Sequence, residues 1–489
     1  MLRLPTRNRK TVLHALLQSL PKESQPVAGD PLYVLTAPCV IRSSLGCAAL
    51  FHAGLAGPIL YWAPPDSCFA SFSVAGTGEA VRLCADGEGA ASDLQGAAER
   101  LFRRISEIRQ AGCESAPRPR LYGGLRFDVG LRGRPAAGAS AATHTESAQD
   151  SDPWHSFPDA SFAMPRWLVL CSDSHCFVQL AIFASELADP SPIESELSAI
   201  ERALSAEHEW AGTAPVVTKR EELSCERYSA MIEAALTEIA DGRLLKVVPA
   251  RRSELQADRT FDQSRIVGLL NDSYPQCNRF AMERNGTVFL GATPELLIEK
   301  CDHTIRTEAL AGTRPRGQSS DDEQLQQALL GDDKERREHA HVVTAIVASL
   351  RECGVSEPVV FATGLRSLRN VHHLCTPIQG RLDADRHVLR LLACLHPTPA
   401  VCGLPRDRAA RFLAEQEPTG RGLYAAPVGW FDASGDGVFW VGIRSALICG
   451  ERAWLYAGAG VVAGSVPHKE YQETSVKLRA MLGVLGAES

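Results

Sequence analysis

The segment from Tyr456 to Leu478, YAGAGVVAGSVPHKEYQETSVKL, restricts the local structure more than any other part of the chain. An apolar strand enters a glycine turn, and the chain leaves that turn in a helix. Glu470, Glu473 and Lys477 follow one another at spacings of three and four residues, so they form one stripe on this helix. Any fold of this chain must therefore place a strand end, a glycine turn and a charged helix face side by side.

Two glycines of this turn, Gly458 and Gly460, lie just before the helix, and the backbone N–H groups of such turns can bind anions. A carboxylate that can hold a metal, beside donors for another carboxylate, indicates a small, acidic, metal-bound substrate. The alternative is a surface ion pair between Glu473 and Lys477, worth about 0.2–0.5 kcal/mol to the helix. The spacing alone leaves both interpretations open.

Length and composition indicate a globular protein with two domains or one large two-layered core. The chain has 489 residues, of which 45% are hydrophobic and 22% charged. Lys and Arg total 51 against 58 Asp and Glu, which gives a net charge of −7, and there is no basic run. This balance argues against a nucleic-acid partner. No apolar stretch is long enough to span a bilayer, so no membrane partner is expected.

The cysteines and the first residues bear on the cellular compartment. The fifteen cysteines include no CxxC pair, which favours buried thiols in a reducing compartment over a disulfide framework or a zinc site. The start, MLRLPTRNRKTVLHALLQSL, is cationic like an organelle transit peptide, but its apolar run is too short for a secretory signal. An amphipathic first helix with Val12, Leu16 and Leu20 on one face accounts for the same pattern. We expect a cytoplasmic protein.

The chain is predicted to have two parts. Residues 1–215 mix short apolar runs, turns and helical segments, and they are expected to contribute strands to sheets shared with the second part. The segment Arg132–Pro153 contains no large apolar residue and is predicted to be a mobile surface loop. Residues 220–489 form the predicted catalytic part, because all the explicit motifs lie there.

Lys246 lies in LLKVVPAR, which is predicted to be a strand with Leu244, Lys246 and Val248 on one side. Apolar neighbours would bury the lysine, and burial without a partner lowers the pKa of an amine. A lysine in such surroundings can act as a general base at neutral pH. The alternative is a lysine at a strand end whose amine reaches solvent.

Glu295 follows a strand and a proline turn in GTVFLGATPELLIEK and precedes three apolar residues. If these neighbours desolvate the carboxyl group, its pKa rises and it can serve as a general acid. The alternative is a carboxylate exposed at the turn.

Glu338 belongs to the predicted helix DDKERREHAHVVTAIVASLREC, in register with Val342 and Ile346. This spacing places the glutamate on the face that packs against the core, where a carboxylate needs a cation or a metal. His339 and His341 form an HxH pair, but no further ligand lies at zinc-site spacing, so zinc is not expected.

Arg444 lies in WFDASGDGVFWVGIRSALI, which is predicted to be a hairpin with Arg444 inside an apolar strand. A guanidinium held in a sheet is suited to bidentate recognition of a carboxylate. The alternative is an arginine that points into solvent from the other face of the strand.

Taken together, the motifs resemble those of the chorismate-utilising enzymes, and among them the isochorismate synthase branch. The matching segments run almost without interruption from Lys246 to Leu482 and include KVVPAR, GATPELL, TEALAGTRPRG, DDKERREH, HPTPAVCG, GDGVFWVGIRSAL and the C-terminal glycine turn. Pro249 departs from the pattern, since that position is usually leucine. So do Val438 and Val466, where acidic residues are common.

The resemblance implies a fold and a reaction. The implied fold is α+β, with two large antiparallel sheets packed face to face and helices outside. The implied reaction is Mg²⁺-dependent conversion of chorismate to isochorismate. In that reaction Lys246 would activate water for attack at carbon 2 of the ring, and Glu295 would protonate the hydroxyl that leaves carbon 4.

The resemblance also implies the residues that hold the metal and the substrate. Glu338 and Glu473 would hold Mg²⁺, with Glu470 as a further candidate. The substrate would be bound by the following residues: Thr313, His373, Arg444, Gly458, Gly460 and Lys477.

Two related activities and one non-catalytic role are the alternatives. Amine-using relatives carry a proline-isoleucine pair before the Gly-Thr where this chain has Leu310 and Ala311, so no glutaminase partner is expected. A salicylate synthase would form isochorismate and then eliminate pyruvate. A chorismate-binding paralogue without activity would have no reason to retain all four of Lys246, Glu295, Glu338 and Glu473. A monomer is expected from the resemblance.

Overall fold

The computed structural model describes most of the chain. The described residues are 30–41, 46–55, 57–65, 72–87, 89–129, 152–207, 213–317 and 321–487. The amphipathic helix predicted near the N-terminus lies outside the described residues. So does the loop predicted at 132–153, apart from its last two residues.

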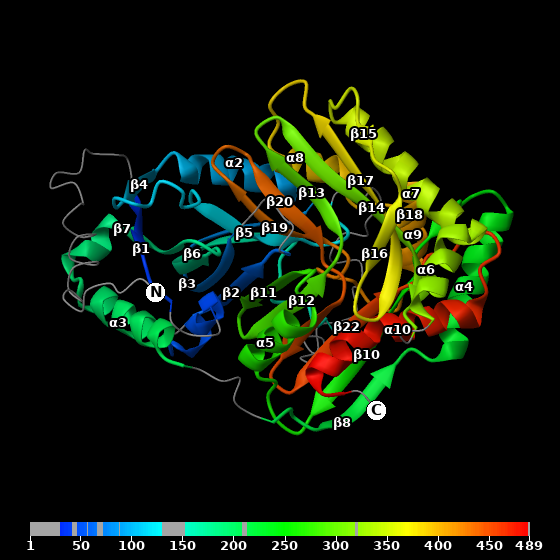
Figure 1. Cartoon of the computed structure of the whole chain (residues 1–489), viewed down its shortest axis with the longest axis horizontal. Helices are drawn as coiled ribbons and strands as arrows, with labels where there is room; N and C mark the ends of the chain where they lie inside the picture. The colour runs from blue at the N-terminus through cyan, green and yellow to red at the C-terminus, as the bar shows by residue number, and fades with distance from the viewer. Residues whose placement is uncertain are drawn as a thin grey trace, which may run out of the picture.

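Strands from both halves of the chain form one hydrogen-bonded network of twenty strands, which has two arms (Figure 1). The first arm is antiparallel throughout except for the parallel pair β1–β4. In spatial order it consists of β4 (Ile105–Arg109), β1 (Leu32–Pro38), β7 (Cys176–Phe183), β6 (Ala160–Cys171), β3 (Ser73–Ala85), β2 (Ile59–Ala63), β11 (Asn278–Arg284), β12 (Thr287–Thr293), β21 (Ser445–Cys449), β22 (Arg452–Gly458), β10 (Ala250–Ala257) and β8 (Val217–Glu222).

The second arm branches from the first at β6. Residues Trp167–Cys171 of β6 pair with β7, whereas Ala160–Ala163 pair with β5 on the same edge. The second arm runs through β5 (Arg120–Leu125), β19 (Pro427–Asp432), β20 (Gly437–Val441), β13 (Leu296–Cys301), β14 (Thr304–Pro315) and β17 (Val371–Arg381), with β15 (Val359–Val360) and β16 (Gly364–Ser367) on the far edge of β17.

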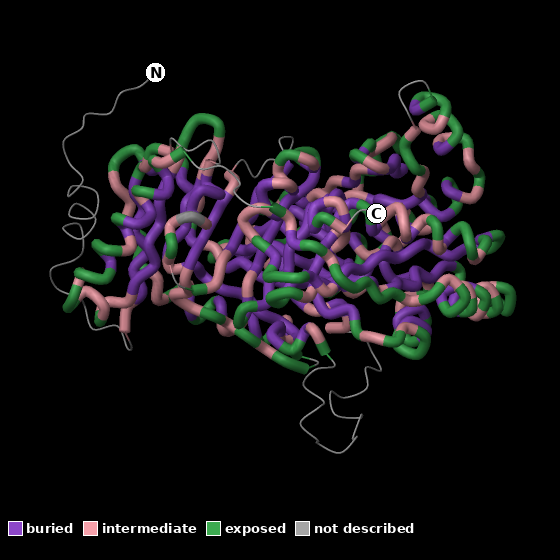
Figure 2. Tube along the Cα trace, turned by 90° about the horizontal axis from the view of Figure 1, so that it is seen from below, coloured by how far each residue is buried: buried purple, intermediate pink, exposed green. Residues whose placement is uncertain are grey.

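The two arms face each other across an aromatic core. Phe162 of β6 packs against Phe431 of β19 and Phe439 of β20, with ring centroids 5.1 and 5.9 Å apart. The same buried cluster includes Phe280 and Phe289 from the first arm. Burial of such rings is the main stabilising contribution available to a two-layered sheet protein. Figure 2 shows buried residues through the interior and exposed residues mainly at the periphery.

Helices cover the outer faces of both arms. Buried residues of α3 (Ser191–Ser205), α5 (Gln263–Ser273) and α10 (Pro467–Leu485) share a second apolar cluster with the first arm. The second arm is covered by α6 (Asp322–Gly331), α7 (Asp333–Glu352) and α8 (Val388–Leu395), with α2 (Ala90–Phe102) beside α8 (Figure 1). The remaining helices are α4 (Cys225–Ala240), α9 (Arg406–Gln416) and the short 3₁₀ helices η1 (Gly46–His52) and η2 (Ala184–Ala188).

These findings confirm the predicted α+β class with large antiparallel sheets and outer helices. The two sheets are joined at β6. Strands of residues 1–215 pair directly with later ones, since β2 pairs with β11 and β5 with β19. Within the described residues, no helix combines the length and apolar character needed to cross a bilayer.

The sequence of α7 explains why this helix forms and which face it buries. Asp332 caps the helix, because its side chain accepts hydrogen bonds from the backbone N–H groups of Lys334 and Glu335. Glu338, Val342 and Ile346 are buried at spacings of four residues, as the sequence predicts. This face packs against β14 and brings Glu338 to the inside of the molecule.

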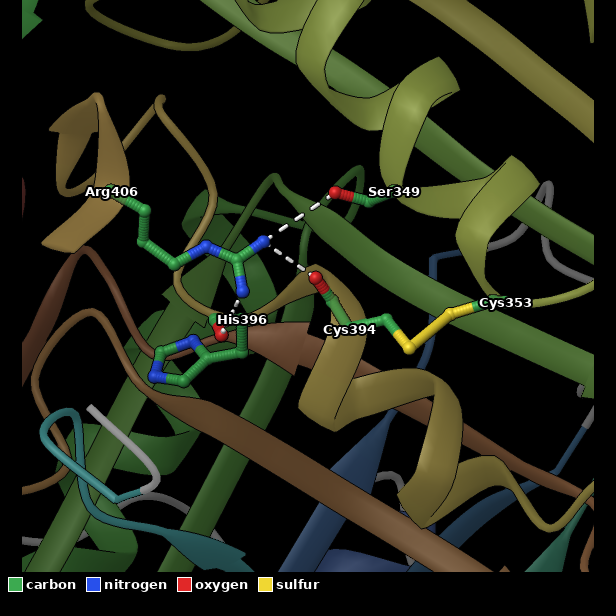
Figure 3. The surroundings of a disulfide bond; sticks show 5 residues. All are labelled: Ser349, Cys353, Cys394, His396 and Arg406. Carbon is green, nitrogen blue, oxygen red and sulfur yellow. Dashed lines mark hydrogen bonds between the residues drawn. A yellow bond between two sulfur atoms is a disulfide. The ribbon is translucent and has the colours of Figure 1, made fainter. Parts of the chain in front are cut away.

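One cysteine pair differs from the prediction of thiols only. Cys353, at the end of α7, is bonded to Cys394 of α8 (Figure 3). The carbonyl of Cys394 also accepts a 2.6 Å hydrogen bond from Arg406, and this arginine lies within 3.4 Å of the Ser349 hydroxyl. The disulfide joins α8 to the end of α7, and Arg406, the first residue of α9, contacts both of these helices. The sequence could not reveal this pair, because residues 41 positions apart meet only in the folded chain.

Candidate active site

One cavity brings together most of the residues that the sequence predicts for the site. Its lining comes from the turn before β13, from β14, α7, β17, the end of β22 and α10. Among the predicted residues, those that line it are Glu295, Thr313, Glu338, His373, Arg444, Gly458, Gly460 and Lys477. Lys246 and Glu473 do not line it directly, but each is ion-paired with a residue that does.

Lys246 is completely buried beside the cavity. It lies on β9 (Lys246–Val247), which forms a ladder with the equally short β18 (Gly403–Leu404) and a single bridge between Val247 and Val461. The Lys246 Nζ lies 2.9 Å from Glu338 Oε1. The prediction of a longer strand is wrong. In such a strand Leu245 and Val247 would share the side opposite Lys246, but Leu245 is 54% exposed whereas Val247 is buried.

Glu295 carries a carboxyl group that stays protonated at neutral pH. Its backbone is fixed by two hydrogen bonds, one from its N–H to Thr293 Oγ1 and one from the N–H of Val441 to its carbonyl. Burial raises the pKa of the Glu295 carboxyl group to about 8, although the positive charge of Lys246 opposes this rise. The alternative of a turn-exposed carboxylate is excluded, since the residue is only 4% exposed.

Glu338 is held in its ionised form by its surroundings. Burial alone would raise its pKa, but the charge of Lys246 and the hydrogen bond with it lower the pKa below its usual value. Gly460 makes room for this pair, because a Cβ atom at that position would lie 2.1 Å from Glu338 Oε1 and 3.2 Å from Lys246 Cε. A side chain at position 460 would therefore displace the ion pair.

Arg444 and His373 form a hydrogen-bonded pair at the cavity wall. Arg444 Nη2 lies 3.1 Å from His373 Nε2, and His373 Nδ1 lies 3.1 Å from both the Gly312 carbonyl and Thr313 Oγ1. Because a guanidinium can only donate, Nε2 accepts and the ring proton resides on Nδ1. Burial, followed by the charges of Arg444 and Lys477, lowers the pKa of His373 well below its usual value, so the ring is neutral.

The structure corrects the predicted setting of Arg444. It does not lie inside a strand but in the short connection from β20 to β21, with a φ of 51°. β20 belongs to the second arm and β21 to the first, so this connection carries the chain from one arm to the other. A positive φ is uncommon for a side-chain-bearing residue, and such strain is concentrated at functional sites.

The charged stripe of α10 lies at the other side of the cavity. Lys477 Nζ is 2.6 Å from Glu473 Oε1 and donates a 2.8 Å hydrogen bond to the Gly458 carbonyl. The lysine and Glu473 are 16% and 21% exposed, so the alternative of a freely solvated surface pair is wrong. Glu470 is buried and paired with Lys334 at 3.0 Å.

The carboxylates around Glu338 have the chemistry of a hard-cation site. Burial and the nearby Glu338 raise the pKa of Glu335 to about 7, and burial and Glu473 raise the pKa of Glu470. Such mutual repulsion among carboxylates is relieved by a divalent cation, and oxygen ligands are those that Mg²⁺ prefers. In the part of the chain that the structure describes, no group of three or more His, Cys, Asp or Glu could hold a metal ion. A cation here would therefore need substrate oxygens or water as further ligands.

Sequence reasoning missed several residues of the site. Glu335 accepts a 2.9 Å hydrogen bond from the backbone N–H of Thr313. Its position one helical turn before Glu338 could have revealed it. Tyr424 and Tyr456 line the cavity with stacked rings 5.1 Å apart, and Arg421 lines it as well. No spacing pattern connects these three residues, because the fold alone brings them together.

The sequence and the fold were compared with those of known proteins. The family model described as "Chorismate binding enzyme" matches residues 42–486. The chain is 34% identical to the salicylate biosynthesis isochorismate synthase of Pseudomonas aeruginosa, over 88% of this chain and 85% of the relative. It is 33% identical to the isochorismate synthase MenF of Bacillus subtilis, over 76% of each chain.

The same relationship is found among solved structures. The menaquinone-specific isochorismate synthase MenF of Escherichia coli superposes with a TM-score of 0.75 and 27% sequence identity, over 98% of this chain and 99% of that chain. The match therefore extends over both arms of the sheet. With a family model that spans nearly the whole sequence, this chain belongs to the family of chorismate-binding enzymes.

Proposed function

We propose that this enzyme converts chorismate to isochorismate. The observation that carries the proposal is the lining of one cavity: a carboxyl group with a pKa of about 8, a glutamate that is ion-paired with a buried lysine, and two cations, Arg444 and Lys477, for a dianionic substrate. The relatives named above are isochorismate synthases, which supports the same reaction.

Lys246 and Glu295 have the properties of a base and an acid for this isomerisation. In its neutral form, Lys246 takes a proton from water as the water oxygen bonds to carbon 2 of the ring. The double bonds shift, and the bond between carbon 4 and its hydroxyl oxygen breaks. Glu295 gives its proton to that oxygen, which leaves as water, so atoms and charge balance. A hydroxide is a poor leaving group without this proton.

The two carboxylates of chorismate match the cations of the cavity. Arg444 is oriented by the neutral ring of His373, which accepts from one of its N–H groups and leaves the others for substrate oxygens. Lys477 is held by the Gly458 carbonyl and by Glu473. Charge pairing in a partly desolvated cavity is strong enough to orient the ring against Glu295.

We propose that Mg²⁺ is required and that Glu338 and Glu473 hold it. The donor set fits, because both side chains offer carboxylate oxygens and the neighbouring Glu335 and Glu470 have pKa values raised by burial and by adjacent carboxylates. When bound, the ion would supply positive charge for the substrate carboxylate and compete with Lys246 for Glu338. This competition would help the base, because the carboxylate at 2.9 Å favours the protonated lysine.

Product analysis tests the proposal directly. Purified protein is incubated with chorismate and Mg²⁺, and the products are separated by liquid chromatography and identified by proton NMR. We expect isochorismate as the product. Salicylate with an equal amount of pyruvate would identify the salicylate synthase alternative, and unchanged chorismate bound to the protein would identify a non-catalytic paralogue.

A further inference from the structure

A buried ion pair binds the backbone next to Lys246 through hydrogen bonds. It takes no part in the proposed chemistry. Arg421 and Glu417 are joined through two nitrogens of the guanidinium, and their side chains are only 4% and 8% exposed. Glu417 follows the end of α9, and Arg421 lies four residues later at the cavity wall. Burial of two charges is costly, so such a pair usually has a specific structural or functional task.

The pair binds the backbone beside β9, which carries Lys246, and beside its ladder partner β18. Arg421 Nη2 donates a 2.7 Å hydrogen bond to the Val248 carbonyl, just after β9. Its Nη1 donates a 2.7 Å hydrogen bond to the Val401 carbonyl, just before β18. Glu417 Oε1 accepts a 2.8 Å hydrogen bond from the N–H of Ala250. A single ion pair therefore fixes β9 and its one ladder partner relative to each other.

The backbone around Pro249 is held by hydrogen bonds on both sides of the proline. The N–H of Val248 donates to the Cys402 carbonyl, and the Pro249 carbonyl accepts from the Tyr228 hydroxyl at 3.0 Å and from the N–H of Ala459. Proline has no N–H of its own. The backbone groups of residues 248 to 250 named above therefore all form hydrogen bonds with identified partners. Position 249 departs from the usual leucine, and here it connects β9 to β10.

We infer that Arg421, with Glu417, is a positioning residue that sets the place of the Lys246 amine in the cavity, an inference that rests on the proposed function. β9 has two residues, far fewer than a typical strand, and its backbone is held by the short ladder with β18 and by one bridge from Val247 to Val461, so the contacts of Arg421 and Glu417 are a large part of what fixes it. Three guanidinium nitrogens of Arg421 are bound to protein atoms, which distinguishes it from Arg444, the cation oriented toward substrate. Arg421 acts on Lys246 through the backbone and does not bind the substrate.

The first variant is Arg421→Lys, which keeps the charge but cannot span three acceptors in one plane. We expect kcat to fall about 10–100-fold, because a misplaced reacting group is costly. KM for chorismate should stay within about twofold of the wild type. The matched control is Arg284→Lys, another buried arginine that contacts a glutamate, Glu79, and a backbone carbonyl, and that lies outside the cavity. Its kcat and KM should both remain near the wild-type values, while thermal unfolding reports the stability of each variant.

A double-mutant comparison separates positioning from a general structural effect. In a Lys246→Ala background, Arg421→Lys should change the residual rate by less than about twofold, since the group it positions is gone. A raised KM with unchanged kcat would instead make Arg421 a substrate ligand and overturn the inference. The inference would also be overturned if Arg421→Lys lowered kcat by the same factor with and without Lys246. A loss of kcat equal to that of the Arg284→Lys control would overturn it as well.

The Arg421→Lys variant could fail to fold, or the wild type could form no isochorismate, and each outcome has its own consequence. If Arg421→Lys does not fold, Arg421 and Glu417 are replaced together by methionine, because removing both charges of a buried pair is often tolerated. The same loss of kcat at constant KM is expected of that double variant. A wild-type protein that forms no isochorismate would contradict the proposed function and remove this inference with it. An active wild type with a normal Arg421→Lys variant would contradict the inference alone.

Discussion

Glu295 is buried away from water, and its chemistry follows from that burial. The carboxyl group is buried in the cavity, and its pKa of about 8 leaves it protonated below that pH. The positive charges of Lys246, Lys477 and Arg444 all oppose this shift, so desolvation outweighs them. An acid that remains neutral at physiological pH is the group needed to protonate a departing hydroxyl.

The activity should therefore depend on pH through Glu295. As pH rises through about 8, the carboxyl group ionises and the acid is lost, so kcat should decrease along this limb. Glu295→Gln fills the same space without a proton to donate, and it should lower kcat by about 10²–10⁴-fold. Initial rates measured from pH 6 to 10 on both proteins check this prediction. A wild-type rate that stays constant above pH 9 would show that Glu295 is not the acid.

Gly460 provides a steric test of the ion pair between Lys246 and Glu338. Alanine at this position would place a Cβ 2.1 Å from Glu338 Oε1, so Gly460→Ala should displace the carboxylate and strongly reduce kcat. Gly331→Ala is the control, because no atom lies within 4 Å of the added Cβ and its φ is not positive. Both variants are compared in kcat and in unfolding temperature. Equal activity of the two variants would contradict the assigned place of Glu338.

At the scale of elements, repeating patterns were predictable and connections were not. The buried face of α7 follows from the spacing of Glu338, Val342 and Ile346, and α3 forms in the charged stretch that begins at Ser191. The burial of Lys246 was also predictable, because its neighbours are apolar. These features depend on residues close together in the sequence, so helical spacing and apolar neighbours are enough to predict them.

The elements that sequence reasoning misplaced are those set by distant contacts. Arg444 reads as part of a strand, yet it lies where the chain crosses between the two arms, and no local pattern records a crossing. The strand that contains Lys246 is two residues long. It forms its ladder with β18, a strand that is equally short and lies far away in the sequence. The backbone contacts of Arg421 and Glu417 could not be found from the sequence, since the groups that they bind are more than 15 residues away.

The connection between β20 and β21 predicts a specific kinetic defect. Arg444→Ala removes a carboxylate ligand and the partner of His373, so KM for chorismate should rise and kcat should fall. Because the side chain is only partly buried, the unfolding temperature should change little. Steady-state kinetics and thermal unfolding check both parts. An unchanged KM would exclude Arg444 from substrate binding.

The whole molecule gathers charges from both sheets and several helices at one point, and this arrangement predicts a metal requirement. Glu338 comes from α7 and Glu473 from α10, two helices that belong to different layers of the fold. Excess EDTA should abolish isochorismate formation, and added Mg²⁺ should restore it. Magnesium should also raise the unfolding temperature of the apoprotein, because it binds only the folded state. Full activity in excess chelator would remove both glutamates from the proposed site.

The central claim is that water adds at carbon 2 while the hydroxyl leaves carbon 4, with Lys246 and Glu295 on the reacting atoms. The most direct measurement is the reaction of unlabelled chorismate in water enriched in oxygen-18, with the product examined by mass spectrometry and carbon NMR. This mechanism predicts isochorismate with one oxygen-18 atom, located in the hydroxyl on carbon 2. Isochorismate without the label would mean that the original hydroxyl migrates within the ring, and it would contradict the roles given to both residues.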